Sequence, residues 1–521
     1  MMQFNLADLF EANVDAFADR LAVVSGPTRQ SYRQLDDRAN QLAHAWAALG
    51  IGQGDHVGLC LYNGHEYLEC MLAAWKLRAR TINVNFRYGA QDLRHLFEDA
   101  RLVGIVTEAD LLPEVQAAAL PAMRHILVRG EAYETFLVGA SAKRDFPARS
   151  ADDLVVIYTG GTTGMPRGVM WRHEDLYFAA LQGGNPGGEP ILVAEDLAPR
   201  MLENGGGLHI LSAPPLIHGS SQLACWIALL NGGVAVIVPG RHFDIRAILD
   251  ACNDEQVHTL NIVGDAMALP LVECLADNPG RWPLAELLVV SSAGAVLSGS
   301  VRERLESLLP NTLAMNNFGA SETGHQGAAF YEGGKPVWVM DERHTVVLDD
   351  ALEPVLPGSG VVGRLARFGN IPLGYFGDDV KTAQTFVRHG GRRYVLPGDM
   401  ATVAADGSVV FLGRGSVCIN TGGEKVFAEE VEEVLKGHPD VFDAVVVGVP
   451  DVRWGQRVEA LVTARCASPD LAGVEIWCRA RIAGYKVPKR MWVVADLGRQ
   501  PSGKPDYRSA QARAIELGEN E

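Results

Sequence analysis

One segment limits the possible folds of this chain more than any other: residues 152–172, DDLVVIYTGGTTGMPRGVMWR. Its apolar run, 154–158, predicts a buried strand. The strand leads into a loop where glycines let backbone N–H groups converge on an anion, while threonine hydroxyls and a guanidinium add donors and positive charge. The segment therefore predicts a phosphate-binding loop formed by Thr159, Gly160, Gly161, Thr162, Thr163, Gly164 and Arg167.

This loop is not a Walker A loop, because the pattern G-x-x-x-x-G-K-[ST] does not occur in it. Its composition alone would also be typical of a glycine-rich surface loop. A second glycine motif, 358–363, has the G-x-G-x-x-G spacing of dinucleotide-binding folds. Pro357 precedes this second motif in place of a strand, so it predicts a turn between strands.

Apolar runs of strand length alternate with segments of helix length along most of the chain. Residues 32–46 have apolar side chains at helical spacing, and a short buried strand is expected from Val57. Further strands are expected at 154–158, 234–238, 287–290 and 409–412, with a helix at 301–309. This alternation indicates α/β architecture. A chain of 521 residues is too long for one hydrophobic core and suggests about three or four folding units.

The last hundred residues form a separable part. Glycines and polar residues crowd 413–425, after which Phe427, Val431, Val434 and Leu435 follow one helical face. A strand is expected next, at VFDAVVVGVP. We therefore predict an N-terminal domain at 1–413 and a C-terminal α+β lid domain at 414–521.

The formal net charge of −17 and the absence of a basic stripe argue against a nucleic-acid partner. The eight cysteines are scattered singly, which fits reduced intracellular thiols better than a disulfide framework or a metal cluster. The first residues lack the features of a secretory signal, and no apolar run approaches the ~20 residues that span a bilayer. We expect a cytoplasmic enzyme without a transmembrane segment.

The segment YTGGTTGMPRG resembles the phosphate loop of the adenylate-forming superfamily, which includes acyl-CoA synthetases, luciferases and the adenylation domains of peptide synthetases. Other segments resemble further motifs of that family, in the order that the family requires: PPLIH (214–218), SSAGAVLSG (291–299), NNFGASETG (316–324), YVLPGD (394–399), GRGSVCINTGGEKV (413–426) and PSGKPDYR (501–508). With SYRQLDDRANQLA near the N-terminus, the resemblance covers nearly the whole chain. It implies a large N-terminal domain of helix-covered β-sheets with a small β-barrel-like subdomain, and a small mobile α+β C-terminal domain.

The resemblance also implies the nucleotide site. Phe318 would offer a stacking face to adenine, opposite Gly294 and Ala295. Asp399 would accept hydrogen bonds from the ribose hydroxyls, with Arg414 beside the same sugar. The implied nucleotide-binding set is completed by Asn317, Gly319 and Ser321, and Glu322 would bind Mg²⁺.

Catalysis in this family requires a carboxylate to attack the α-phosphorus of ATP, so positive charge must offset the approach of two anions. Lys504 matches the family lysine that contacts both reactants, and Glu322, Thr163 and Arg167 would assist by holding Mg²⁺ and the phosphates. In the second half-reaction, as the family implies, the C-terminal domain rotates and Lys504 leaves. Gly422 and Gly423 then line the coenzyme A tunnel, although Val417 stands where most relatives have an aspartate hinge.

We therefore predict an acyl-CoA ligase that uses ATP and coenzyme A. The segment TGGTTGMPRGVMWR resembles actinobacterial ligases for steroid side-chain acids or other bulky and long apolar acids, and the predicted acyl-binding residues are His218, Gly219, Ser220, Gly264, Gly319 and Ala320. Three alternatives stay open: another acyl acceptor, luciferase-like oxidation, and a non-catalytic acyl- or nucleotide-binding regulator. The sequence leaves the choice between a monomer and a homodimer open.

Overall fold

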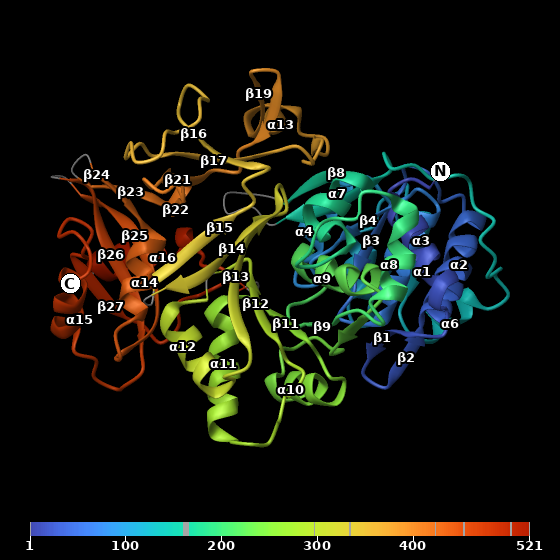
Figure 1. Ribbon diagram of the computed structural model, residues 1–521, viewed down its shortest axis with the longest axis horizontal. Coiled ribbons are helices and arrows are strands. Elements are labelled where there is room, and N and C mark those ends of the chain that lie inside the picture. The colour runs from blue at the N-terminus through green and yellow to red at the C-terminus, as the bar shows by residue number, and fades with distance from the viewer. Residues whose placement is uncertain are drawn as a thin grey trace.

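The computed structural model describes residues 2–159, 166–295, 297–332, 335–421, 424–451, 454–500 and 503–519. Figure 1 shows a large N-terminal part built from helices and sheets, with a smaller C-terminal part beside it. This is the predicted α/β architecture. Within the described ranges, every helix is too short or too polar to cross a lipid bilayer.

The N-terminal part begins with two helices, α1 (Leu6–Phe17) and α2 (Tyr32–Ala48). A capping box starts α2: the Ser31 hydroxyl accepts the Gln34 backbone N–H, and the Gln34 side chain accepts the Ser31 N–H. The side chains at helical spacing in 32–46 are buried, which confirms the predicted amphipathic helix.

A parallel sheet with the strand order β4–β3–β5–β6 follows. Parallel neighbours need a crossover connection, and a helix follows each strand here. Its elements are β3 (His56–Cys60), α3 (His65–Lys76), β4 (Arg80–Asn83), α4 (Ala90–Asp99), β5 (Leu102–Thr107), α5 (Leu112–Ala118), β6 (His125–Val128) and α6 (Glu131–Leu137).

A larger mixed sheet runs through the centre of the molecule (Figure 1). Its strands are β1 (Leu21–Ser25), β2 (Thr28–Ser31), β9 (His209–Ser212), β10 (Val234–Ile237), β11 (Thr259–Ile262), β12 (Val289–Ala293), β13 (Leu313–Ala320), β14 (Gly324–Glu332) and β15 (Lys335–Met340). The path β1–β10–β9–β11–β12–β13 is parallel, and β14 and β15 continue it in antiparallel fashion. The helices of this region are α8 (Leu197–Glu203), α9 (Gly219–Leu230), α10 (Ile245–Asp254), α11 (Gly264–Asp277) and α12 (Gly299–Leu308), with short 3₁₀ turns η1 (Gln182–Gly184) and η2 (Ala194–Asp196).

Between these two sheets, a hairpin carries the predicted phosphate loop. It consists of β7 (Leu154–Thr159) and β8 (Arg167–Arg172), and β8 also pairs with the short strand β18 (Gly374–Tyr375). Helix α7 (His173–Ala180) follows the hairpin. The strand predicted at 154–158 is confirmed.

An antiparallel extension of the central sheet stands at the top of Figure 1 and accounts for the predicted small β subdomain. It comprises β16 (Thr345–Leu348), β17 (Gly363–Phe368), α13 (Asp379–Thr385), β19 (Phe386–His389), β20 (Arg392–Val395), β21 (Asp399–Val403) and β22 (Val409–Arg414). The glycine motif at 358–363 forms a turn that leads into β17, as expected.

The C-terminal part has a sheet of its own, with the order β24–β23–β26–β25 and β27 parallel to β26. Its elements are η3 (Gly415–Val417), β23 (Cys418–Thr421), β24 (Glu424–Phe427), α14 (Ala428–Lys436), β25 (Val441–Asp451), β26 (Gly455–Ala464), α15 (Leu471–Arg479), β27 (Arg490–Val493) and α16 (Tyr507–Glu519). This arrangement agrees with the predicted α+β C-terminal domain. Phe427 ends β24 and begins the turn into α14, so it precedes the helix on which we expected it.

The strand predicted at 287–290 lies two residues further along the chain, as β12. Ser291 and Ser292 continue the pairing with β13 although they are polar, and Leu284 has a left-handed φ of 47° in the turn before the strand. Apolar periodicity alone does not detect a strand whose end is polar.

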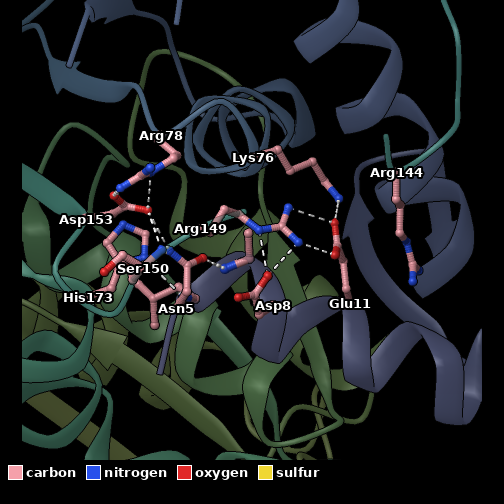
Figure 2. Close-up of polar contacts among 12 residues, drawn as sticks. Asn5, Asp8, Glu11, Lys76, Arg78, Arg144, Arg149, Ser150, Asp153 and His173 are labelled. Atoms are coloured by element: carbon pink, nitrogen blue, oxygen red, sulfur yellow. Dashed lines mark hydrogen bonds and ion pairs between the residues drawn. The ribbon is translucent and has the colours of Figure 1, made fainter. Parts of the chain in front are cut away.

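A network of charged side chains fastens α1 to the rest of the N-terminal part (Figure 2). Lys76, fully buried at the end of α3, contacts the carboxylates of Glu11 and Asp36, the second at 2.8 Å. Arg149 donates to Asp8 at 2.6 Å and also contacts Glu11. Burial of ions is costly unless each is paired, and here the carboxylates and cations compensate one another across α1, α2, α3 and the segment before β7.

We expect Lys76→Met to destabilise the protein by about 3–5 kcal/mol, because it removes the buried cation that Glu11 and Asp36 share and leaves their charges only partly compensated. The matched control is Arg94→Met, which removes an exposed ion pair to Glu98 within α4 and should change stability by less than about 0.5 kcal/mol. Urea unfolding followed by tryptophan fluorescence measures both. Equal effects of the two substitutions would contradict the role of the Lys76 network.

Candidate active site

The predicted phosphate loop connects β7 to β8, and Thr159 lies opposite Arg167 in the hairpin. Residues 160–165, which include Gly160, Gly161, Thr162, Thr163 and Gly164, lie outside the described residues. The Arg167 guanidinium is partly exposed and donates from Nε to Asp378 at 3.0 Å. Asp378 in turn caps α13 by accepting the Lys381 backbone N–H. Asp378 therefore holds the Arg167 guanidinium in place at the end of the loop.

Glu322 lies in the turn between β13 and β14, close to this hairpin. Its Oε1 accepts a hydrogen bond of 3.0 Å from the hydroxyl of Tyr375, on the strand that pairs with β8. Burial and the negative charge of Glu322 raise the pKa of Tyr375, while the positive charge of Arg167 acts in the opposite direction. The Tyr375 hydroxyl thus lies close enough to Glu322, the predicted metal ligand, and to Arg167, the predicted phosphate-binding cation, for both charges to affect its pKa.

The predicted adenine-binding residues lie at the ends of β12 and β13, which are neighbours in the central sheet. Gly294 has a left-handed φ of 85°, and the Ala295 carbonyl accepts a 2.9 Å hydrogen bond from the Ser292 hydroxyl. The ring of Phe318 lies 4.9 Å from that of Phe411, centroid to centroid. Aromatic packing of this kind holds the Phe318 ring in a defined place.

The residues that flank Phe318 are held by the same strand. The Asn317 side chain donates to Ser291 on β12. A Cβ atom on Gly319 would lie only 2.1 Å from the Gly324 carbonyl oxygen, so this position requires glycine. Ala320 ends β13, and the Ser321 carbonyl accepts a 2.8 Å hydrogen bond from the Trp171 indole on β8. The sequence NNFGAS thus joins the central sheet to the hairpin.

Asp399 begins β21 and pairs in register with Arg414 at the end of β22. Asp399 is buried. The two residues predicted to contact the same sugar are therefore cross-strand neighbours in the backbone.

Lys504 reaches this site from the C-terminal domain. Its Cε lies 3.7 Å from the place that a Cβ on Gly294 would occupy. Gly503 packs against the beginning of α11, where a Cβ would lie 3.1 Å from Ala266 and 3.3 Å from Val263. A lysine near the C-terminus thus lies beside a glycine more than two hundred residues earlier.

His218 lies at the start of α9, within the field of Lys504. Burial, Lys504 and Arg87 lower the pKa of His218 to about 4, so its ring is neutral at pH 7. Its Nε2 is buried and has no hydrogen-bond partner among the described residues. A buried nitrogen without a partner costs free energy, which is typical of functional positions rather than of a packed core.

The other predicted acyl-binding residues lie around His218. A Cβ on Gly219 would lie 3.1 Å from Ile157 and 3.8 Å from the Ser321 hydroxyl, and Ser220 follows in the first turn of α9. Gly264 begins α11, and its N–H donates to the Ser292 hydroxyl at 2.9 Å. The structure therefore brings the predicted acyl residues together with Lys504 and Gly294.

A small apolar cavity of about 10 Å³ lies behind Ile157 and α9, and Met71, Trp75, Leu223 and Trp226 help to line it. A volume of this size holds about one water molecule.

The sequence did not identify Tyr375, Asp378 or Arg87 as parts of the site. Tyr375 and Asp378 stand close together in LGYFGDD, a run whose glycines and carboxylates indicate only a turn. Their relation to Glu322 and Arg167 depends on the pairing of β18 with β8. Gly422 and Gly423, predicted to line the coenzyme A tunnel, lie outside the described residues.

The described residues contain no group of three or more His, Cys, Asp and Glu side chains that could enclose a metal ion. Glu322 is thus a single candidate carboxylate, with one oxygen engaged by Tyr375. This fits Mg²⁺, which commonly takes one or two carboxylates and fills its other positions with water and substrate phosphates.

We expect His218 to reduce the stability of the fold as the pH falls from about 6.5 to about 4. In this range the unfolded chain protonates an ordinary histidine, whereas the folded ring does not bind a proton until the pH approaches 4. A His218→Gln variant lacks this effect. We measure the difference in thermal unfolding midpoint between the variant and wild type by circular dichroism. This difference should shift in favour of the variant between pH 7 and about pH 4.5. The same difference at both pH values would contradict the lowered pKa of His218.

Comparisons with known proteins agree with the resemblance in the sequence. Residues 10–369 match the AMP-binding enzyme family, and residues 430–504 match the AMP-binding enzyme C-terminal domain. The chain is similar to a medium/long-chain-fatty-acid–CoA/3-oxocholest-4-en-26-oate–CoA ligase of Mycolicibacterium smegmatis, with 44% identity over 98% of this chain and 96% of that protein. It is also 42% identical to a 3-oxocholest-4-en-26-oate–CoA ligase of Rhodococcus rhodochrous, over 98% of this chain and 96% of the relative.

Among solved structures, the fold is similar to that of an anthranilate CoA ligase in complex with anthranoyl-AMP. The TM-score is 0.84 at 21% identity, and the match covers 99% of each chain. The predicted fold class is therefore confirmed. Sequence and fold together show that this chain belongs to the AMP-binding enzyme family.

Proposed function

We propose that this protein is a cytoplasmic acid–CoA ligase. It activates a carboxylic acid with ATP to an acyl-adenylate and pyrophosphate, and then transfers the acyl group to coenzyme A. The observation that carries the proposal is the position of Lys504, whose Cε lies 3.7 Å from where a Cβ on Gly294 would be and whose charge acts on His218. A single cation between the predicted adenine wall and the predicted acyl residues can contact both reactants.

The proposed acid is long or bulky and apolar, such as a fatty acid or a steroid side-chain acid. The names of the relatives from Mycolicibacterium and Rhodococcus support this class. Gly219 adds no side chain beside His218, where a Cβ would already lie 3.1 Å from Ile157, and most side chains that line the cavity behind Ile157 are apolar. The neutral ring of His218 also suits a pocket for an uncharged acyl group.

In the first half-reaction, a carboxylate oxygen forms a bond to the α-phosphorus as the bond from that phosphorus to the bridging oxygen of pyrophosphate breaks. No general base is needed, because the acid is already ionised at neutral pH. Lys504 offsets the negative charge shared by the carboxylate and the α-phosphate, and Arg167 with the threonine-rich loop holds the leaving phosphates. Mg²⁺ bound at Glu322 would neutralise phosphate charge.

For nucleotide recognition, we propose that Phe318 stacks on adenine opposite Gly294 and Ala295, and that Asp399 binds the ribose. The cross-strand pairing of Asp399 with Arg414 supports a shared role at the sugar. A carboxylate can accept both ribose hydroxyls because it has only acceptor sites.

In the second half-reaction, we propose that the C-terminal domain, residues 414–521, rotates about the segment near Val417. Lys504 then leaves the site, and the loop with Gly422 and Gly423 approaches it. The coenzyme A sulfur attacks the acyl carbon, the bond to the AMP oxygen breaks, and the thiol proton passes to solvent.

The direct test is a screen of acids from acetate through fatty acids to steroid carboxylates, with ATP, Mg²⁺ and coenzyme A. We expect AMP, pyrophosphate and an acyl-CoA in equal amounts, with the highest kcat/KM for long or bulky acids. Formation of ADP, or no turnover with any acid, would overturn the proposal. Light emission or oxygen uptake without thioester would favour the luciferase-like alternative, and ligand binding without turnover would favour a regulator.

We expect Lys504→Ala to lower the rate of adenylate formation by about a hundredfold or more, because it removes the cation from between the two anions. Thioester formation from a presynthesised acyl-adenylate should stay near the wild-type rate. The matched control is Lys489→Ala, an exposed lysine of the same domain, which should change neither rate. Equal loss of both half-reactions in the Lys504 variant would contradict the role of Lys504.

We expect Glu322→Gln to raise the Mg²⁺ concentration needed for half-maximal adenylation by at least about tenfold, because the variant loses a charged ligand. Glu342→Gln, at an exposed position, serves as the control. The measurement is pyrophosphate release as Mg²⁺ is titrated at saturating ATP. An unchanged Mg²⁺ requirement would exclude Glu322 as the ligand.

A further inference from the structure

The C-terminal domain contacts the N-terminal domain through one end of α14. The Glu433 carboxylate accepts the backbone N–H of Gly299, the first residue of α12, at 2.9 Å. The Ser300 hydroxyl donates to the Lys436 carbonyl at 3.3 Å. A carboxylate at a helix N-terminus satisfies an unpaired N–H group and interacts favourably with the helix dipole. Helix α14 thus supplies to α12 a cap that α12 lacks in its own sequence, since Ser298 makes no side-chain cap bond.

A buried ion pair lies beside this cap. Lys436, the last residue of α14, is 8% exposed, and its Nζ lies 3.5 Å from Oδ2 of Asp265 in the first turn of α11. The other oxygen of Asp265 accepts the Ser298 backbone N–H at 2.8 Å. The Asp265 carboxylate is therefore fixed by its own domain and offers one oxygen to the other domain.

The same turn of α11 also receives the loop that carries Lys504. Gly503 packs on Val263 and Ala266, which flank Asp265 closely in the sequence. Arg499 holds this loop: it makes two 2.7 Å hydrogen bonds to the Asp443 carboxylate and donates to the Gly503 carbonyl at 3.1 Å. Lys436 and the Lys504 loop are thus attached to one short segment of the N-terminal domain.

The charged groups around Lys436 favour its protonated, positively charged form. Burial alone would lower the pKa of Lys436, but Asp265, Asp443 and Glu432 raise it above the usual value. Only Asp265 among these three carboxylates belongs to the N-terminal domain, because Asp443 lies on β25 and Glu432 on α14. The pairing between domains therefore depends on Asp265.

We infer that Asp265 and Lys436 are positioning residues for the first half-reaction. Their ion pair stabilises the orientation of the C-terminal domain in which Lys504 occupies the active site, and it breaks when that domain rotates for thioester formation. This inference rests on the proposed function. A contact that exists in only one of two orientations shifts the equilibrium towards that orientation by its own free energy.

In Asp265→Asn, the asparagine keeps an oxygen that can accept the Ser298 N–H, but Lys436 loses its partner across the interface. We expect adenylate formation from acid and ATP to slow by about tenfold or more, because a buried cation without its partner disfavours this orientation. Thioester formation from a presynthesised acyl-adenylate should stay at or above the wild-type rate.

The matched control is Asp277→Asn, the same substitution at the exposed far end of α11, which should change neither half-reaction. A second test removes the cation as well. The double variant Asp265→Asn/Lys436→Met removes both charges of the pair between the domains, so its adenylation rate should be no lower than that of Asp265→Asn alone.

Three results would overturn the inference: an unchanged adenylation rate in Asp265→Asn, an equal loss of both half-reactions, or a double variant that forms adenylate more slowly than Asp265→Asn alone. Thioester formation also reports that the variants are folded. Failure of the proposed function can be distinguished from failure of this inference. In the first case, the wild-type enzyme itself would convert neither free acids nor presynthesised acyl-adenylates.

Discussion

The geometry of the whole site depends on the contact between the Lys504 loop and the first turn of α11. Glycine at 503 lets this loop approach Val263 and Ala266, and Cε of Lys504 lies 3.7 Å from the place that a Cβ on Gly294 would occupy. The central sheet fixes both partners of this contact, because β11 leads into α11 and its neighbour β12 leads into Gly294. The flexible Lys504 side chain becomes a defined part of the site because the backbone at Gly503 and the backbone at Gly294 are both held in place.

The chain carries a net charge of −17, yet it is proposed to gather two anionic reactants. The cations that matter are local and separately anchored: Arg167 by Asp378, and Lys504 through the loop that Arg499 holds. Charge–charge interactions weaken with distance and with solvent, so cations at the site outweigh carboxylates spread over the surface. The neutral state of His218 also avoids a further positive charge next to the proposed apolar acyl group.

Local patterns in the sequence predicted the elements that local chemistry determines. The amphipathic helix at 32–46 and the strand before the threonine-rich loop are confirmed. Both could be predicted because spacing and caps are visible in the sequence. The site was predicted from its resemblance to a family, and the roles of its residues stay predictions. The bonds from Tyr375 to Glu322 and from Arg167 to Asp378 join residues 53 and 211 positions apart, so only the pairing of β18 with β8 reveals them. The pairing of Lys436 with Asp265 was invisible for the same reason.

The polar character of the contact at α14 suits the rotation that we propose for the C-terminal domain. Phe442 packs against the apolar cluster of α11 and α12, but the neighbouring contacts are an ion pair, a carboxylate cap and a hydroxyl bond. Each apolar Å² returned to water costs about 25 cal/mol, whereas ions and N–H groups regain water when they separate. An extensive apolar interface would therefore hold Lys504 in the site and slow the second half-reaction. In the proposed rotation, a few buried polar contacts would favour the first orientation while leaving the second one accessible.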